Sequence, residues 1–368
     1  MAIKKLILHL GMSKAGSTSI QHTLFNNATI LEKNGFRYLT EWGQNHLHVL
    51  KHIFSSFPVS PLDRKLIGRP LTEKERERDK RKLINTMLEV INSTDCENLI
   101  LSGEFWGQLH FDSTIENISN FLDKYFRRKG IEAHIIFLVR NPLTHTISSF
   151  QQKLFAGTYN EHFLEGNIRA FEGIINLQKH FTDSLTLLKF EDAALDKDGL
   201  VGCFLKAIGY PKDKIQELDI LRANDSRCLE VMELAGYIES REPATPYGIN
   251  NTVNPKREPL GADLTPLKNI KGTKFDFPYR DKLALWSYLK GTVNSLKENI
   301  GIDYTGYQIA PLSSEEETYN EATIQEFIEA YPKLNPIIQG LFLDFFEAKY
   351  NETLNEKFKK LYSSSVVS

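Results

Sequence analysis

The chain has 368 residues, of which 41% are hydrophobic and 25% are charged, and its formal net charge is −2. This composition is ordinary for a soluble globular protein with one large domain or two. A chain so close to neutrality lacks the broadly basic surface of a general nucleic-acid or membrane binder, so any anion site must be local. We therefore expect no nucleic-acid partner.

Targeting and redox signals are weak. No run approaches the roughly 20 apolar residues that a membrane-spanning helix needs. Lys4 and Lys5 precede neither a signal-peptide core nor a cleavage site. The cysteines Cys96, Cys203 and Cys228 are odd in number and widely spread, which predicts no disulfide framework. We expect a cytoplasmic protein with no integral membrane segment.

Near the N-terminus, an apolar run leads into a Gly- and Ser-rich turn and then into a helix-forming segment. Residues 6–10 suit a buried strand and residues 17–24 suit a helix. Gly11 and Gly16 permit a tight turn between them. The first N–H groups of a helix lack intrahelical acceptors and bind anions. The segment therefore predicts a phosphate-binding loop, to which Lys14 adds a positive charge.

The spacing of Gly11 and Gly16 matches the nucleoside-triphosphate loop GxxxxGK[ST], but Ser17 stands where that loop has its lysine. The lysine is instead Lys14, inside the turn and closer to a single 5′-phosphate than to β- and γ-phosphates. This displacement argues against an ordinary ATPase. The structural alternative is a plain turn with a solvated lysine.

Three histidines follow within residues 44–52, namely His46, His48 and His52. His48 and His52 are four residues apart, which places them on one face of an expected helix. Such a pair is part of a zinc motif, but the glutamate of H-E-x-x-H is missing and no cysteine lies nearby. We therefore expect no metal site.

Residues 64–82 form a mixed charge run that predicts a loop and then a solvated helix beginning after Thr72. This helix completes a helical insertion of about residues 45–95. Residues 97–102 predict the next strand, and Glu104 follows its end. The Glu104 carboxylate is therefore expected at the carboxyl edge of the sheet, beside the phosphate-binding loop.

Residues 133–139 predict a buried strand that ends at Arg140, and Pro142 suits the first turn of the helix that follows. Ligands of open α/β sheets bind at the carboxyl ends of the strands, and a guanidinium matches phosphate oxygens. Ser148 lies about two turns into that helix. The structural alternative is an arginine paired with a carboxylate, and an ordinary helix serine.

The rest of the chain continues the alternation of strands and helices, which indicates an α/β fold. Residues 185–190 predict a strand that runs into Glu191 and Asp192, expected to pack and to cap. An amphipathic helix is expected at 200–209. Residues 241–280 are rich in Pro, Gly, Asn and Thr and predict a long loop.

Two motifs together resemble the sulfotransferases that use 3′-phosphoadenosine 5′-phosphosulfate (PAPS). The segment Lys14-Ala15-Gly16-Ser17-Thr18 fits their loop pattern K-[ST/A]-G-[ST]-[ST]. Arg140 and Ser148 have the spacing of their 3′-phosphate site. Residues 222–226 also resemble the R-x-N-x-S stretch of bacterial carbohydrate-type members, and the likeness covers about residues 3–305.

The resemblance implies a three-layer α/β sandwich with a mostly parallel central sheet and a P-loop-like nucleotide site. We expect this domain to span residues 1–310, with the helical insertion at about 45–95 and the long loop at about 241–280. Residues 311–368 are expected to form a C-terminal helical extension that packs on the core.

The resemblance also implies PAPS as co-substrate, adenosine 3′,5′-bisphosphate (PAP) as product, and no metal. It implies that Lys14 contacts the bridging oxygen and the 5′-phosphate of the donor, and that Arg140 and Ser148 bind its 3′-phosphate. Residues 271–274 are a weaker candidate for the 3′-phosphate. The other donor-binding residues that it implies are Ala15, Gly16, Ser17, Thr18 and Ser19.

Sulfuryl transfer needs a base that takes the proton of the acceptor hydroxyl, and Glu104 is the first choice. Because a solvated glutamate is a weak base, the apolar neighbours Phe105 and Trp106 are expected to raise its pKa. Several sulfotransferase branches use a histidine, so His46 is the alternative base.

The expected acceptor is a hydroxyl on a glycan or a small molecule, and likeness to bacterial members favours a carbohydrate or glycolipid. The sequence does not determine the oligomeric state. One alternative function is a small-molecule P-loop kinase, which would need Mg²⁺ ligands and a lysine beside Ser17. The other is a non-catalytic nucleotide-binding interaction protein, which would bind PAP without turnover.

Overall fold

The computed structural model describes residues 2–55, 72–157, 159, 162–221, 226–241, 264–310 and 320–349. Contacts divide the chain into two compact units that alternate along the sequence. Unit 1 comprises Met1–His145, Leu164–Asn224 and Trp286–Tyr307, and unit 2 comprises Thr146–Phe163, Asp225–Leu285 and Gln308–Ser368. The expected domain of residues 1–310 thus takes in all of unit 1 together with the first two segments of unit 2.

Unit 1 is built on a five-stranded sheet in which all neighbouring strands are parallel. The strands follow the order β2-β3-β1-β4-β5. They are β1 (Lys5–Leu10), β2 (Phe36–Tyr38), β3 (Asn98–Gly103), β4 (Glu132–Val139) and β5 (Leu185–Lys189). Strands covered on both faces are continuous apolar runs, which is why the sequence predicted β1, β3 and β4. The half-buried edge strand β5 was also predicted. The short edge strand β2 was not predicted.

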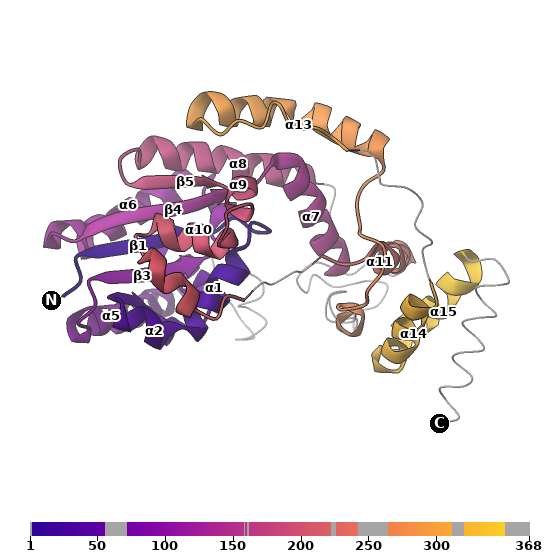
Figure 1. Ribbon diagram of the computed structural model, residues 1–368, viewed down its shortest axis with the longest axis horizontal. Coiled ribbons are helices and arrows are strands. Elements are labelled where there is room, and N and C mark those ends of the chain that lie inside the picture. Colours follow the sequence, from indigo (N-terminus) through magenta and orange to yellow (C-terminus); the bar gives the residue numbers. More distant parts are fainter. Residues whose placement is uncertain are drawn as a thin grey trace. The chain divides into compact units, whose positions relative to one another are not determined.

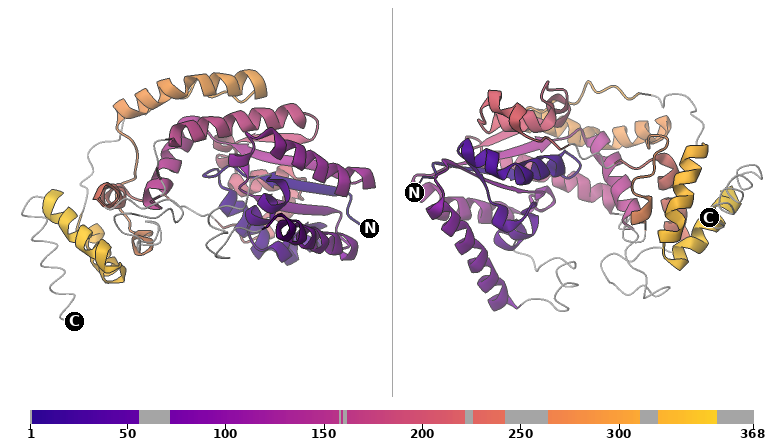
Figure 2. Two further views of the ribbon diagram at one scale, coloured as in Figure 1. Left: turned by 180° about the vertical axis from the view of Figure 1, so that it is seen from behind. Right: turned by 60° about the horizontal axis from the view of Figure 1, so that its bottom comes forward.

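Helices cover both faces of this sheet, so unit 1 has three layers (Figures 1 and 2). One face carries α1 (Ser17–Asn26), α2 (Ala28–Lys33) and α10 (Gly199–Ala207). The other carries α3 (Leu47–Phe54), α5 (Glu73–Ser93) and α6 (Asp112–Tyr125). Right-handed connections between parallel strands place these helices on opposite faces of the sheet. The reason is that the chain moves across the sheet in one direction from β1 to β2 and in the opposite direction from β2 to β5. The predicted three-layer α/β fold is confirmed.

The remaining described helices complete both units. They are α7 (Pro142–Phe155), α8 (Phe163–His180), α9 (Phe190–Ala194), α11 (Leu229–Arg241), α13 (Tyr279–Ile300), α14 (Glu321–Ala330) and α15 (Pro336–Lys349). Short 3-10 helices are η1 (Thr40–Trp42), η2 (Trp106–Gln108), η3 (Arg127–Lys129), η4 (Lys212–Glu217), η6 (Thr265–Leu267) and η7 (Tyr331–Lys333). The described helices include none whose length and hydrophobicity would suffice to cross a bilayer.

The helix predicted after Thr72 is α5, and it begins with a capping box. The Glu75 N–H donates to Thr72 Oγ1 at 3.3 Å, and the Thr72 N–H donates to Glu75 Oε2 at 2.8 Å. Its first half is solvated, as the mixed charges predicted. Its second half buries one apolar face, made of Ile84, Met87, Val90 and Ile91.

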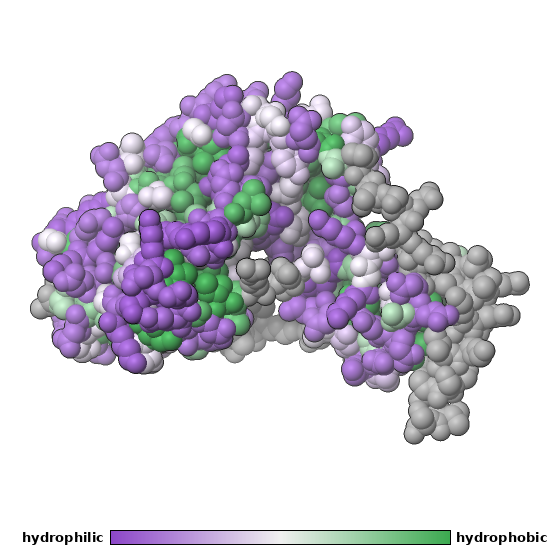
Figure 3. All heavy atoms as spheres, viewed as in Figure 1, coloured by the Kyte–Doolittle hydropathy of each residue, from purple (hydrophilic) through white to green (hydrophobic). Residues whose placement is uncertain are grey.

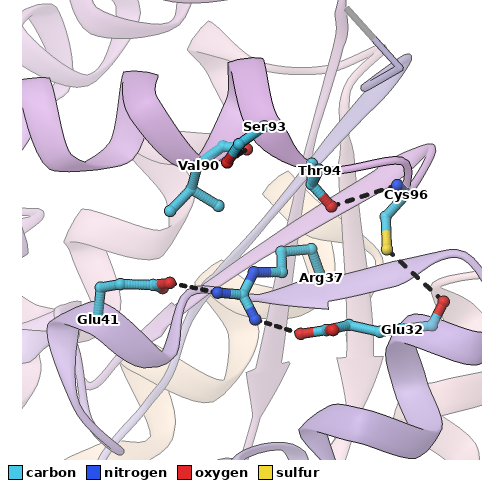
Figure 4. Close-up of polar contacts among 7 residues, drawn as sticks. All are labelled: Glu32, Arg37, Glu41, Val90, Ser93, Thr94 and Cys96. Atoms are coloured by element: carbon cyan, nitrogen blue, oxygen red, sulfur yellow. Dashed lines mark hydrogen bonds and ion pairs between the residues drawn. The ribbon is translucent and has the colours of Figure 1, made fainter.

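The edge strand β2 is held by charged and polar contacts (Figure 4). Arg37 of β2 pairs with Glu32 of α2 and with Glu41 of η1. Close by, the buried Cys96 donates its N–H to Thr94 Oγ1 at 3.2 Å and its thiol to the Glu32 carbonyl at 3.6 Å. These contacts join α2, η1 and the residues before β3 at this edge of the sheet.

Unit 2 has an apolar core of its own, to which α11, η6, α14 and α15 contribute. Phe342, Phe345 and Phe346 of α15 lie in this core and are fully buried. The ring of Phe342 lies 5.8 Å from that of Phe327 in α14. The C-terminal helices thus contribute to an apolar cluster separate from that of the sheet.

Candidate functional site

The loop between β1 and α1 is closed by its own hydrogen bonds. The Ala15 N–H donates to the Met12 carbonyl at 3.3 Å, and Ser17 Oγ donates to the same carbonyl at 3.1 Å. The Gly11 N–H donates to the Gly103 carbonyl at 2.8 Å, which ties the loop to the end of β3. A Cβ at Gly11 would lie 2.2 Å from Ser17 Oγ, so this position requires glycine.

Two residues of the loop adopt left-handed backbone conformations, Gly16 with φ +79° and Lys14 with φ +59°. Within the described part of the chain, Lys14 is the one residue other than glycine with a positive φ. A non-glycine residue pays about 1–2 kcal/mol for this conformation, and such strain clusters at functional sites. The fold therefore holds a strained lysine just before the N-terminus of α1.

Replacing Gly16 with alanine should destabilise unit 1, because a Cβ there would lie 2.4 Å from Leu200 Cδ2 on a backbone with φ +79°. Strain and overpacking together should lower the free energy of unfolding by about 2–4 kcal/mol. Gly35 is a matched control, since its φ is +81° and no described atom lies within 4 Å of an added Cβ. Urea unfolding should show a smaller loss for Gly35→Ala, and equal losses would contradict the packing argument.

Helix α1 begins at Ser17, with Gly16 as its N-cap, and no described side chain caps it. The Ile20 N–H donates to the Gly16 carbonyl at 3.2 Å, so the helical ladder starts there. The N–H groups of the first turn before it have no intrahelical acceptor, and the helix dipole favours a negative charge at this end. Ser17 and Ser19 are buried and Thr18 is half-buried. This terminus and Lys14 together can bind a phosphate.

Arg140 lies at the same edge of the sheet as Lys14. β4 ends at Val139 next to β1, and the Arg140 Nη1 donates to the carbonyl of Lys14. Its Nε donates to Thr144 Oγ1 at 3.1 Å, and its guanidinium lies 4.9 Å from the centre of the Phe190 ring. Burial lowers the pKa of Arg140, and the negative charge of Glu191 opposes that effect. The structure thus brings the Arg140 guanidinium to the backbone of Lys14, two residues that the sequence predicted on separate strand ends.

Glu104 comes directly after β3, one residue beyond the Gly103 carbonyl that accepts the Gly11 N–H. It is half-buried. Its neighbour Phe105 is fully buried, with its ring 5.6 Å from that of Phe54. Trp106 is 9% exposed and lies edge-on to His145 at 4.6 Å. The backbone of Glu104 therefore lies beside the start of the loop between β1 and α1.

His46 is fully buried next to β3, and both its backbone and its ring bond to Ser102. The His46 N–H donates to the Ser102 carbonyl at 2.9 Å, and the Ser102 N–H donates to His46 Nδ1 at 3.0 Å. The ring stacks on Tyr38 with centres 4.7 Å apart. Burial lowers the pKa of His46 to about 4. The ring is therefore neutral at pH 7, with its basic nitrogen already accepting a hydrogen bond.

The other two histidines lie on α3, where His52 Nδ1 is 3.0 Å from the His48 carbonyl. Within the described ranges, no group of three or more His, Cys, Asp or Glu side chains is arranged to hold a metal ion.

A cavity of about 320 Å³ lies in unit 1 beside the start of α1. Its size is in the range of small-molecule sites. One wall is the turn at residues 196–199. Both Asp196 and Asp198 of this turn pair with Lys206 of α10 at 2.6 Å. Apolar side chains gather on the surface around α1 and α10 (Figure 3). The cavity is lined by Gly16, Ser19, Phe190, Ala194, Asp196, Lys197, Asp198, Gly199, Leu200, Val201, Ile220 and Leu221.

Sequence reasoning missed most of this cavity. It placed Phe190 at the end of a predicted strand and assigned no ligand-binding role to Leu200, Ile220 or Leu221. The available signal was the position of Phe190 at the carboxyl end of β5, because ligands of parallel sheets bind at that edge.

Other predicted site residues belong to unit 2. Ser148 is on α7, in the part of that helix that belongs to unit 2. Residues 271–274 also belong to unit 2, where the Thr273 N–H and hydroxyl donate to the buried Glu230. Residues 222–225 lie outside the described residues.

Comparisons with known proteins found structural likeness alone, because no family model and no curated protein matches the chain. A sulfotransferase from Alicyclobacillus acidocaldarius is similar at 12% identity, over 56% of this chain and 81% of that one, with a TM-score of 0.37. Retinol dehydratase in complex with androsterone and inactive cofactor PAP is 15% identical, over 83% and 82%, with a TM-score of 0.35. Its complex with retinol and PAP is 13% identical, over 84% of each chain, with a TM-score of 0.32.

Proposed function

We propose that this chain is a sulfotransferase, which moves the sulfuryl group of PAPS to an acceptor hydroxyl and releases PAP. The observation that carries the proposal is the contact of the Arg140 guanidinium with the carbonyl of Lys14. It joins the lysine of the K-A-G-S-T loop to the arginine that ends β4, so one doubly phosphorylated adenosine could reach both.

The proposed donor site uses three neighbouring features of unit 1. The 5′-phosphate would bind Lys14 and the residues from Ala15 to Ser19, at the positive end of α1. The adenine would enter the cavity beside Gly16 and Ser19, against the ring of Phe190. The 3′-phosphate would bind Arg140, whose planar fork suits phosphate oxygens.

In the proposed reaction, the Glu104 carboxylate takes the proton of the acceptor hydroxyl as the acceptor oxygen bonds to sulfur. The bond from sulfur to the bridging oxygen breaks in line, and the electron pair stays on the 5′-phosphate of PAP. Lys14 and the first N–H groups of α1 stabilise the charge that builds there. Glu104 is preferred to His46 because the basic nitrogen of His46 already accepts the Ser102 N–H.

The proposed acceptor is a hydroxyl of a carbohydrate or glycolipid, with other small molecules as the alternative. Incubation with labelled PAPS and a panel of glycans, glycolipids, phenols and sterols should identify it. Transfer to a phenol or sterol alone would contradict the carbohydrate assignment while leaving the sulfotransferase proposal intact.

The first test of the donor is calorimetric titration with PAP and with ADP. Because one charge-assisted phosphate contact contributes about 1.5–3 kcal/mol, PAP should bind roughly tenfold to a hundredfold more tightly. A small-molecule kinase would instead favour ADP and depend on Mg²⁺. A non-catalytic nucleotide binder would prefer PAP and show no transfer to any acceptor in the panel.

A further inference from the structure

We infer that Glu191 and Tyr304 are positioning residues that hold the Arg140 guanidinium in place for a 3′-phosphate. This inference rests on the proposed function, because Arg140 is the residue that would distinguish PAP from ADP. Glu191 is at the start of α9, and Tyr304 follows the end of α13. Both lie in unit 1, as Arg140 does.

The Glu191 carboxylate connects to Arg140 through Asn141 and Thr144, which follow Arg140 in the chain. The Arg140 Nε donates to Thr144 Oγ1 at 3.1 Å, and that hydroxyl lies 3.4 Å from Glu191 Oε1. The same Glu191 oxygen accepts the Asn141 N–H at 3.0 Å. Glu191 thus holds both the backbone directly after Arg140 and the hydroxyl that accepts from its guanidinium.

Tyr304 closes this network from the other side. Its hydroxyl lies 2.7 Å from Glu191 Oε2 and 2.8 Å from the carbonyl of Val139, the residue directly before Arg140. The side chain is 3% exposed, and the Lys189 ammonium lies 4.9 Å from the centre of its ring. The backbone is therefore fixed immediately before and immediately after Arg140, by a single tyrosine and a single carboxylate.

The charge of Glu191 also matters, because Arg140 is half-buried. Desolvation disfavours the guanidinium, and Glu191 supplies the largest compensating attraction on it. Nε and Nη1 are engaged by Thr144 and by the Lys14 carbonyl, which sets the plane of the fork. A bidentate phosphate contact depends on that plane, so its loss should weaken binding of the 3′-phosphate in particular.

The experiment is calorimetric titration of PAP and ADP into the full chain and into Glu191→Gln and Tyr304→Phe. Each variant removes one part of the network and keeps the shape of the side chain. Loss of one such hydrogen bond should weaken PAP binding about five- to tenfold and leave ADP binding unchanged. Tyr288→Phe is the matched control, because Tyr288 lies on α13 and is 52% exposed, and it should bind both nucleotides as the wild type does.

The ratio of the two affinities separates positioning from a merely structural role. The fold-loss of PAP affinity in the double variant should be smaller than the product of the fold-losses in the two single variants, because both residues act on one arginine. If Glu191→Gln does not fold, Thr144→Val tests the same connection by removing the bridging hydroxyl alone. The inference is overturned if the variants keep the wild-type ratio of PAP affinity to ADP affinity, for instance because they lose affinity for PAP and ADP equally. A wild-type protein with no preference for PAP overturns the proposed function, and this inference with it.

Discussion

Replacement of Lys14 with alanine should lower the rate of sulfuryl transfer by two to four orders of magnitude. In the proposed reaction, negative charge accumulates on the departing 5′-phosphate beside Lys14, and deletion of such a contact costs about 3–5 kcal/mol of transition-state stabilisation. The measurement is kcat/KM with labelled PAPS and a saturating acceptor. PAP binding should weaken by a smaller factor, since the charge on the 5′-phosphate is larger in the transition state.

The backbone of Lys14 provides a second readout for this prediction. Lys14→Gly removes the ammonium and also relieves the cost of φ +59°. The glycine variant should therefore be as inactive as Lys14→Ala, yet at least as stable as that variant in thermal unfolding. Lys33→Ala, at an exposed position of α2, is the control and should change neither property. Full turnover in Lys14→Ala would refute the role of the lysine.

Glu104→Gln should lower the rate of transfer by about three orders of magnitude or more, while PAP still binds. The variant keeps the shape and polarity of the side chain but cannot accept the proton of the acceptor hydroxyl. General-base catalysis accounts for about 10²–10⁴ in rate, so a loss of this size fits a base. The measurement pairs single-turnover transfer with calorimetric PAP binding, which separates the chemical step from donor affinity.

Two controls sharpen the assignment of the base. Glu97→Gln changes an exposed glutamate just before β3 that pairs with Lys4, and it should leave turnover intact. His46→Gln should lower stability through its lost contacts with Ser102 and Tyr38, but should retain turnover and its pH profile. If His46→Gln abolishes transfer and Glu104→Gln does not, Glu104 is not the base.

Much of the fold follows from local sequence patterns. The apolar runs that became β1, β3 and β4 are buried on both faces, and helices alternate with them. Gly11 and Gly16 mark the loop because the backbone there needs conformations, or a close approach, that other residues resist. Arg140 was predicted to lie at a strand end because the apolar run of residues 133–139 stops directly before it. The pairing of β1 with β3 and β4 then placed the loop, Glu104 and Arg140 at one edge.

Apart from the short edge strand β2, the sequence by itself determined the order of the strands and of the main helices that alternate with them, because periodicity, turn residues and caps act over a few positions. Tertiary structure alone decided which side chains meet across long separations. His46 bonds to Ser102 over 56 residues, Asn141 to Glu191 over 50, and Tyr304 to Glu191 over 113. Such contacts leave no local pattern in the chain, because they depend on which strands become neighbours and on how far each group is removed from water.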